Sequence, residues 1–362
     1  MAANRVLKLL NGPNTLGGSL AFWAVFALGA VALFAQPITR GAFAASQFTV
    51  YLALALVALS LALIWGYAGI LSFGQTVFFG LAAYTYALIS LNMEGALGAT
   101  IALPASLLVA TVSAFLLGYF MFYGDVRDVY VAIMTLVVTL VFGTFLAQTA
   151  GSEWTVGDVA LGGFNGIPGV PDFTLGVGGT AFTFSGAMFY WLVLTVLLAV
   201  YLGLRMLVNS RYGYALIAVR EDEDRTEMLG YDVRRTKLAV FTFSGFLAGL
   251  GGVFYVTWNN YVNPEPFTLL WATLPVVWVT LGGRKSLLGP VAGTIFVEWL
   301  RKFLSINAPE LAIPFVGATL LVSILLLPQG VLPGIETAYH WLRDTLTDGS
   351  TVADDPQEGT PE

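Results

Sequence analysis

The chain has 362 residues, of which 57% are hydrophobic and only 10% are charged, and its mean hydropathy is +0.79. Ordinary globular domains carry about 25% charged residues, so this composition cannot cover a water-facing surface. It excludes a soluble enzyme, a nucleic-acid-binding protein and a disordered scaffold as descriptions of the whole chain. The formal net charge of −6 arises mostly from residues 348–362, which hold five acidic residues and no basic one.

Ten apolar stretches have the length, or nearly the length, of a membrane-spanning helix. Crossing a hydrocarbon core of about 30 Å takes roughly 20 mostly apolar residues. The stretches are continuous and lack strand-like alternation, which favours helices over a β-barrel. In chain order they are 19–36, 47–65, 74–91, 97–123, 129–150, 186–207, 238–258, 268–281, 287–300 and 311–328. The sequence therefore predicts an all-α integral membrane protein with about ten transmembrane helices.

The distribution of Lys and Arg predicts the orientation of these spans, because both residues accumulate in cytoplasmic segments. If ten spans begin on the inside, the inside segments hold 13 of the 16 Lys and Arg residues and the outside segments hold 3. We therefore expect a multi-pass protein with both termini in the cytoplasm.

The same topology divides the chain into three regions. Residues 1–18 form a cytoplasmic N-terminal segment, 19–347 a transmembrane domain, and 348–362 a tail too poor in apolar residues to fold. Within the domain, the loop 151–185 faces outward and is rich in Gly and Pro. The loop 208–237 faces inward and carries 12 of the 38 charged residues, six of each sign.

The spans are nearly free of charge, which argues against an ion-coupled transporter, since these usually need a titratable residue within the bundle. Glu298 is the one acid well inside a span, and its neighbours Arg301 and Lys302 favour an interfacial ion-paired residue over proton coupling. One His and no Cys leave no His/Cys zinc site and no His-based triad. We expect no metal and no cofactor on this chain, so uphill transport would need a partner that supplies the work.

The glycines of the first inward hairpin predict that its helix is broken. Gly66, Gly69 and Gly74 lie within nine residues, and each costs a helix about 1 kcal/mol relative to Ala. Such a break is tolerated in a membrane only where protein or a water-filled cavity satisfies the freed backbone groups. One interpretation is a substrate path, and the alternative is a tight turn with close helix packing. The expected path residues are Ser72, Gly74, Gln75, Thr76 and Phe78, with Thr135 and Thr139 four apart on the fifth span.

The inner loop has the pattern of a short amphipathic helix. Apolar residues flank the charged stretch 220–227, and Gly230 is a plausible helix C-cap. A helix of this kind presented to the cytosol suits docking into a groove on another protein. On the pattern alone, a solvated loop is the more common explanation.

Two pairs of glycines predict close helix packing. Gly245 and Gly249, like Gly289 and Gly293, are spaced four apart, which lets helix backbones approach each other closely in a membrane.

Four segments together resemble the membrane subunits of bacterial ABC importers for branched-chain amino acids, and the related urea and short-chain amide permeases. They occur in the family's order, and the resemblance covers about residues 45–335. The segments are GYAGILSFGQTVFFGLAAY (66–84), GGFNGIPGVP (162–171), SRYGYALIAVREDEDRTEMLGYDVRRTKL (210–238) and LGGRKSLLGPVAGTIF (281–296).

This resemblance implies a non-catalytic permease subunit of the bacterial inner membrane. Its partners would be a second, similar permease chain, two cytosolic ATPase subunits that bind ATP and Mg, and an extracytoplasmic substrate-binding protein. The region 213–230 would be the coupling helix that docks on the ATPase. The implied coupling residues are Ala215, Leu216, Val219, Arg220, Glu221, Asp222, Glu223, Leu229 and Gly230.

The resemblance leaves the substrate and two other classes of function open. The expected substrate is a branched-chain or other apolar amino acid, and the alternative is urea or a short-chain amide. Arg225 and Thr226 stand where many family members have two alanines, which slightly favours a urea-like or otherwise divergent branch without deciding between them. A passive channel for a small neutral solute would share the broken helix and the uncharged spans. A purely structural subunit of another complex would carry no flux.

Overall fold

The computed structural model describes residues 9–15, 17–93, 95–151 and 153–326, and the predicted acidic tail lies outside these ranges. Each of the ten predicted spans overlaps one long helix. These helices are α2 (Leu20–Arg40), α3 (Ala42–Leu61), α4 (Gln75–Asn92), α5 (Gly95–Tyr123), α6 (Asp128–Ala147), α7 (Gly186–Val208), α10 (Val233–Asn259), α11 (Leu269–Gly282), α12 (Leu288–Asn307) and α13 (Pro309–Leu326).

The helices confirm an all-α membrane protein, although the count of ten spans is not confirmed. By length and composition, six helices among the described residues can cross a membrane: α2, α3 with its continuation to Tyr67, α5, α6, α7 and α10. Helix α11 is apolar but has only 14 residues. Helix α12 carries Glu298, Arg301 and Lys302 towards its C-terminal end, which lowers its apolar character.

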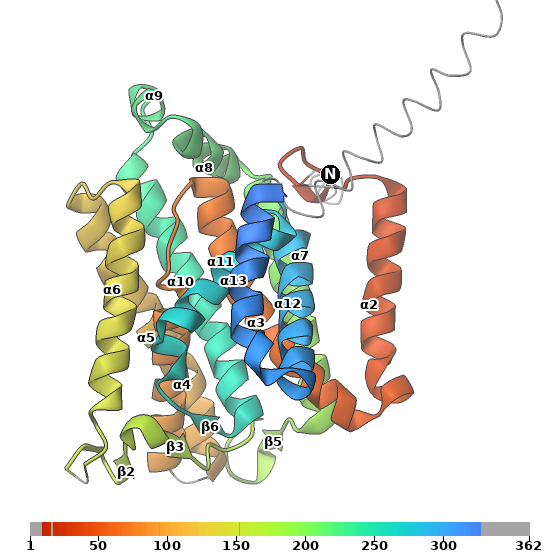
Figure 1. The fold of residues 1–362 in the computed structure, drawn as a ribbon, viewed down its shortest axis with the longest axis vertical. Coiled ribbons are helices and arrows are strands. Elements are labelled where there is room, and N and C mark those ends of the chain that lie inside the picture. The colour runs from red at the N-terminus through yellow and green to blue at the C-terminus, as the bar shows by residue number, and fades with distance from the viewer. Residues whose placement is uncertain (1–8, 16, 94, 152, 327–362) are drawn as a thin grey trace, which may run out of the picture.

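Helix α3 lies at the centre of the bundle. It contacts α7, α10, α11 and α12, and its residues from Leu52 to Leu61 are almost completely buried. Helix α10 extends this core by packing against α3, α4 and α5. Helix α2 contacts α3 and α7, but most of its length stands beside the bundle (Figure 1).

Glycines allow the closest of these helix contacts. A side chain at Gly245 or Gly249 of α10 would collide with Ala114 or Ala110 of α5, and one at Gly252 would collide with the Phe79 carbonyl oxygen of α4. In the same way, a side chain at Gly293 would collide with the carbonyl oxygen of Trp278. The close packing predicted from the two glycine pairs is confirmed.

The hairpin between α3 and α4 is broken, as predicted. Helix α3 continues as a π-helix over Ala62–Tyr67, and residues 69–74 then have no helical structure before α4 begins at Gln75. This stretch runs from one end of the bundle back into its interior (Figure 1). Helix α4 therefore starts inside the bundle, where its N-terminal N–H groups have no preceding helical turn.

The two ends of the bundle differ (Figure 1). The short helices α8 (Arg211–Glu221) and α9 (Glu223–Met228) cover one end, here called the α8 end. Six two-residue strands lie at the other, here called the strand end. Antiparallel pairs join β1 (Thr155–Val156) to β2 (Val159–Ala160), β3 (Ile167–Pro168) to β6 (Tyr261–Val262), and β4 (Thr174–Leu175) to β5 (Phe182–Thr183).

Candidate functional site

Helix α8 is fastened to the bundle by the apolar residues of the predicted coupling region. Ser210 caps its N-terminus, and its side chain accepts a hydrogen bond from the backbone of Gly213. Ala215, Leu216 and Val219 are buried, and α8 contacts α7, α10 and the π-helix. These three side chains therefore hold α8 against its own chain.

Charged residues position α9 and the start of α10. The Asp222 carboxylate caps α9 by accepting a hydrogen bond from the Arg225 backbone at 2.9 Å. Glu223 forms an ion pair with the largely buried Lys237 of α10. Arg234 forms another, at 2.8 Å, with Asp125 between α5 and α6. Of the predicted coupling residues, Asp222 and Glu223 thus order the loop that carries them.

An exposed apolar surface of this end lies at the end of α9 and just after it. Met228 is 86% exposed and Leu229 is 72% exposed, and Tyr231 is half exposed. We call these three residues the α9 patch. Gly230 has a φ of 87°, a left-handed conformation that ends α9 and turns the chain away from it. The sequence analysis named Leu229 and Gly230 as coupling residues but not Met228 or Tyr231. The available signal for Met228 and Tyr231 was that apolar side chains occur in a highly charged loop.

Arg220 connects α8 to the broken hairpin. Its Nη1 donates a hydrogen bond to the Gly66 carbonyl oxygen at 2.5 Å, and its other nitrogens bond Glu221. The guanidinium lowers the pKa of the exposed Glu221 carboxyl, which stays ionised at neutral pH. A Cβ at Gly66 would collide with the carbonyl oxygen of Arg284, so this position has room for glycine alone. Among the predicted coupling residues, Arg220 thus bonds the backbone of the broken hairpin directly.

The polar residues of the break are brought together with α6. Thr135 accepts a hydrogen bond from the Phe73 backbone at 3.1 Å, and Thr139 donates one to the Phe73 carbonyl oxygen at 3.3 Å. The Ser72 hydroxyl accepts from the backbone of Gly74 at 3.0 Å. Both threonines also bond carbonyls of their own helix, so their hydroxyls serve two roles. Thr135 and Thr139 therefore lie beside the break, and their role in a substrate path stays a prediction.

Gln75 and Thr76 stand at the buried N-terminus of α4. The Gln75 side-chain oxygen accepts a hydrogen bond from Ser60 of α3 at 2.9 Å. Within the described residues, Gln75 Nε2 and Thr76 Oγ1 have no partner, although both side chains are buried. Buried polar atoms are almost always hydrogen-bonded, so these atoms have capacity for a water or a solute. Phe78 instead packs edge-on against Phe241 of α10, in the apolar core.

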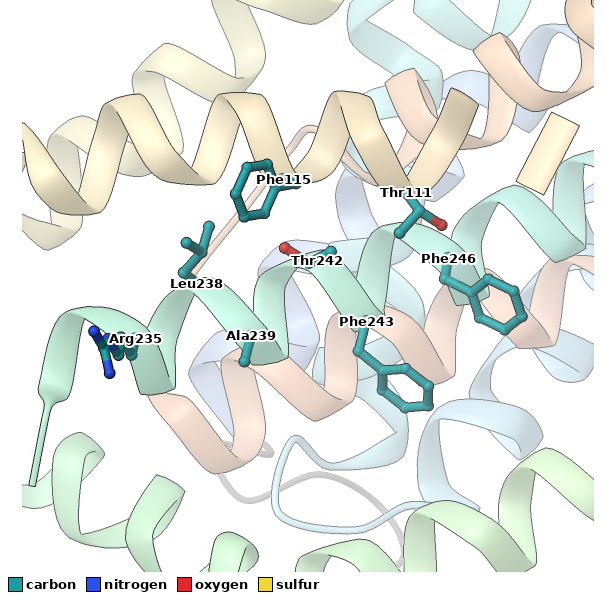
Figure 2. A pocket seen from close by; sticks show the side chains of 8 residues that line it. All are labelled: Thr111, Phe115, Arg235, Leu238, Ala239, Thr242, Phe243 and Phe246. Atoms are coloured by element: carbon teal, nitrogen blue, oxygen red, sulfur yellow. The ribbon is translucent and has the colours of Figure 1, made fainter. Parts of the chain in front are cut away.

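A separate groove of about 550 Å³ lies between α5 and α10. Thr111 and Phe115 line one side, and six residues of α10 line the other, from Arg235 to Phe246 (Figure 2). Apart from Arg235 and two threonines, its walls are apolar. None of the predicted pathway residues lines this groove.

The part of the chain that the structure describes contains no group of three or more His, Cys, Asp or Glu side chains arranged to hold a metal ion.

The chain matches the family model described as branched-chain amino acid transport system / permease component over residues 43–324. It is 29% identical to the high-affinity branched-chain amino acid transport system permease protein LivM of Escherichia coli (strain K12), over 92% of this chain and 81% of that protein. It is 30% identical to LivM of Salmonella typhimurium, over 77% of this chain and 67% of that protein.

A more distant match is the autoinducer 2 import system permease protein LsrC of Klebsiella pneumoniae, 28% identical over 44% of this chain and 47% of that protein. No solved structure matches the chain. The family model spans the whole bundle from α3 to α13, including the broken hairpin and the α8–α9 loop. The chain therefore belongs to the permease-component family of branched-chain amino acid transport systems.

Proposed function

We propose that this chain is the transmembrane subunit of an ATP-driven importer that carries branched-chain or other apolar amino acids. The observation that carries the proposal is the similarity to LivM of Escherichia coli along 92% of the chain. The broken, uncharged hairpin and the charged loop that contacts its π-helix fit such a subunit. The chain itself hydrolyses no ATP in this scheme, and ATP and Mg bind to its partners.

The α8 end would face the cytoplasm of a bacterial cell, with the protein in the inner membrane. The excess of Lys and Arg in the segments at that end supports this orientation. Two ATPase subunits would dock there, and the α9 patch offers them an exposed apolar surface. A second permease chain would complete the pathway, and an extracytoplasmic binding protein would deliver substrate to the strand end.

The coupling mechanism follows from the contacts of α8. Closure of the ATPase dimer would displace α8 and α9 together, because Asp222 caps α9 directly at the end of α8. Arg220 would pass this displacement to the Gly66 carbonyl, and so to the non-helical stretch 69–74. A break absorbs a backbone change more easily than an intact helix does, since fewer hydrogen bonds must be lost. The polar atoms of Gln75 and Thr76 would then gain or lose access to solute.

The test is purification of the tagged chain with its native partners, followed by reconstitution into liposomes. The retained binding protein is screened with leucine, urea and acetamide, and ATP-dependent uptake of the ligand is measured. Leucine uptake with two ATPases and a second permease supports the proposal. Uptake of urea or acetamide alone would assign the related amide branch, and ATP-independent flux from a homo-oligomer would indicate a channel.

Docking is tested by charging the α9 patch. M228E and L229E place carboxylates on exposed positions, so folding is unaffected, while an apolar contact with the ATPase is lost. We expect ATP-driven uptake to fall at least about tenfold, since burying an unpaired charge at an interface costs several kcal/mol. F43E, at an exposed position at the strand end of α3, is the matched control and should leave uptake unchanged. Unchanged uptake in M228E and L229E would contradict docking at this patch.

A further inference from the structure

A cleft lined by charged and aromatic residues lies at the strand end, away from the broken hairpin and the α8–α9 loop. It is a cleft of about 520 Å³, within the range of about 300–1,000 Å³ of small-molecule sites. Five elements line it: α3, α10, α11, α12 and the 3₁₀ turn η4 (Glu265–Phe267). Its charged side chains come from α12 and η4, and its aromatic rings come from α3, α10 and α11.

Glu298 and Arg301 form an ion pair in this cleft. Glu298 is only 3% exposed, and one of its oxygens accepts a hydrogen bond from Trp278 at 3.2 Å. Its other oxygen accepts from Arg301 Nε at 3.0 Å and forms the ion pair with Nη2 at 2.8 Å. The pairing predicted for Glu298 is confirmed for Arg301, whereas Lys302 bonds a different partner. The Glu298–Arg301 pair adds no net charge to the cleft.

Two further charges of opposite sign face the same cleft without neutralising each other. The Lys302 ammonium donates to the neutral Gln47 carboxamide at 2.5 Å. The Glu265 carboxylate accepts from the Trp271 indole at 3.0 Å. Among the described residues, neither Lys302 nor Glu265 forms an ion pair. The cleft thus offers one cation and one anion, both solvent-accessible, to a molecule that carries both charges.

The wall of the cleft is aromatic. Trp271 and Tyr255 meet edge-to-face with ring centroids 5.8 Å apart, and Trp258 extends the wall 6.2 Å from Tyr255. The apolar lining is completed by Val50, Leu54 and Leu270. Such a surface attracts an aliphatic side chain by excluding water, and its ring faces attract an ammonium group.

From these features we infer that the cleft binds an α-amino acid as a zwitterion, as an entry site for the transported solute. Lys302 receives the carboxylate, Glu265 receives the ammonium group, and the aromatic wall receives an aliphatic side chain. The assignment rests on the proposed function and narrows its substrate class, because urea and amides present no full charges to Lys302 and Glu265. It also places substrate at the strand end before it reaches the break.

The experiment is photolabelling of the reconstituted complex, without binding protein, by a diazirine analogue of leucine. We expect the label on peptides that contain Trp271 or Glu298, and competition by leucine. L-Leucinamide lacks the carboxylate and 4-methylpentanoate lacks the ammonium group, so both should compete at least about tenfold less well, as should urea. K302Q and E265Q should each reduce labelling by about the same factor. R40Q and E310Q remove exposed charges at the strand end outside the cleft and should have no effect.

Equal competition by leucine, leucinamide and 4-methylpentanoate would show a merely apolar slot, such as one filled by lipid, and would overturn the inference. Labelling elsewhere, or unchanged labelling in both K302Q and E265Q, would overturn it as well. ATP-driven leucine uptake with the binding protein, measured on the same liposomes, separates the two claims. Uptake without cleft labelling refutes the entry site alone, whereas absence of any amino-acid uptake refutes the proposed function.

Discussion

Helices α2 and α3 are neighbours in the chain and both are apolar enough to cross a membrane, yet they occupy opposite environments. In α3, 83% of the membrane-spanning window is buried inside the protein, whereas in α2 the share is 6%. Lipid tails and leucine side chains are equally apolar, so composition does not separate a helix that faces lipid from one that faces protein. The two helices differ because neighbouring helices surround α3 but not α2.

The contacts of the two helices show this difference in detail. Helix α3 is surrounded by α7, α10, α11 and α12 and also carries the π-helix that leads into the break. Helix α2 is tied to α7 where the Tyr190 hydroxyl lies 2.8 Å from both the Leu33 carbonyl oxygen and the Gln36 side-chain oxygen, which share its hydrogen bond. The inner helix is therefore held by packing and the outer one by a few contacts. This comparison predicts a graded series of mutational effects.

The largest effect is expected from a glycine that touches the inner core. G252L would drive a side chain into the Phe79 carbonyl of α4, and because the obstacle is backbone it cannot turn away. We expect almost no folded protein, measured by size-exclusion chromatography of a fluorescent fusion. Gly29 of α2 has nothing within 4 Å of an added Cβ, so G29L is the matched control and should express normally. Equal yields of the two variants would contradict the comparison.

A smaller effect is expected from truncating a leucine on each helix. L56A leaves a cavity at a fully buried site of α3 and should cost about 2–5 kcal/mol of unfolding free energy. L28A shortens a side chain that is 70% exposed, and lipid fills the space, so its cost should be near zero. Thermal unfolding in detergent measures both. If L28A proved as destabilising as L56A, a partner would have to cover α2 in the purified protein.

The smallest effect is expected where α2 is attached. Y190F keeps the ring and removes the hydroxyl that bonds Leu33 and Gln36, which should cost about 0.5–1.5 kcal/mol. The loss should be local to α2. Because the chain has no cysteine, single cysteines introduced on α2 and α7 can carry spin labels, and Y190F should broaden the distance distribution between them. An unchanged distribution would show that packing alone positions α2.

The sequence is sufficient to predict the helices but not their surroundings. Each predicted span overlaps a helix because about 20 apolar residues have few other structures available in a bilayer. The break at Gly66–Gly74 was equally predictable, since three glycines weaken a helix wherever it lies. The central position of α3 was not predictable, because α2 and α3 are alike in hydrophobicity. They differ in how many other helices pack against them.

The same limit applies to the α8–α9 loop. Ala215, Leu216 and Val219 were expected to take part in docking because the family resemblance places them in the coupling helix. In the structure they pack against the bundle, whereas Met228 and Leu229 stay exposed. A single sequence gives the number of apolar residues in a loop but not which of them its own chain covers. The cleft that contains Glu265 and Lys302 combines five separate elements, and the sequence indicated only its Glu298, Arg301 and Lys302 cluster.

The crowding around Gly66 constrains how this family can vary in sequence. Gly66, Arg220 and Arg284 come from segments far apart in the chain, and they meet where Arg220 bonds the Gly66 carbonyl and the Arg284 backbone closes the space beside it. A larger residue at position 66 requires the turn at 283–286 to move, and that movement changes the surroundings in which Arg220 bonds the residue 66 carbonyl. Related chains that lack glycine at this position should therefore carry compensating changes in both other segments, inherited together.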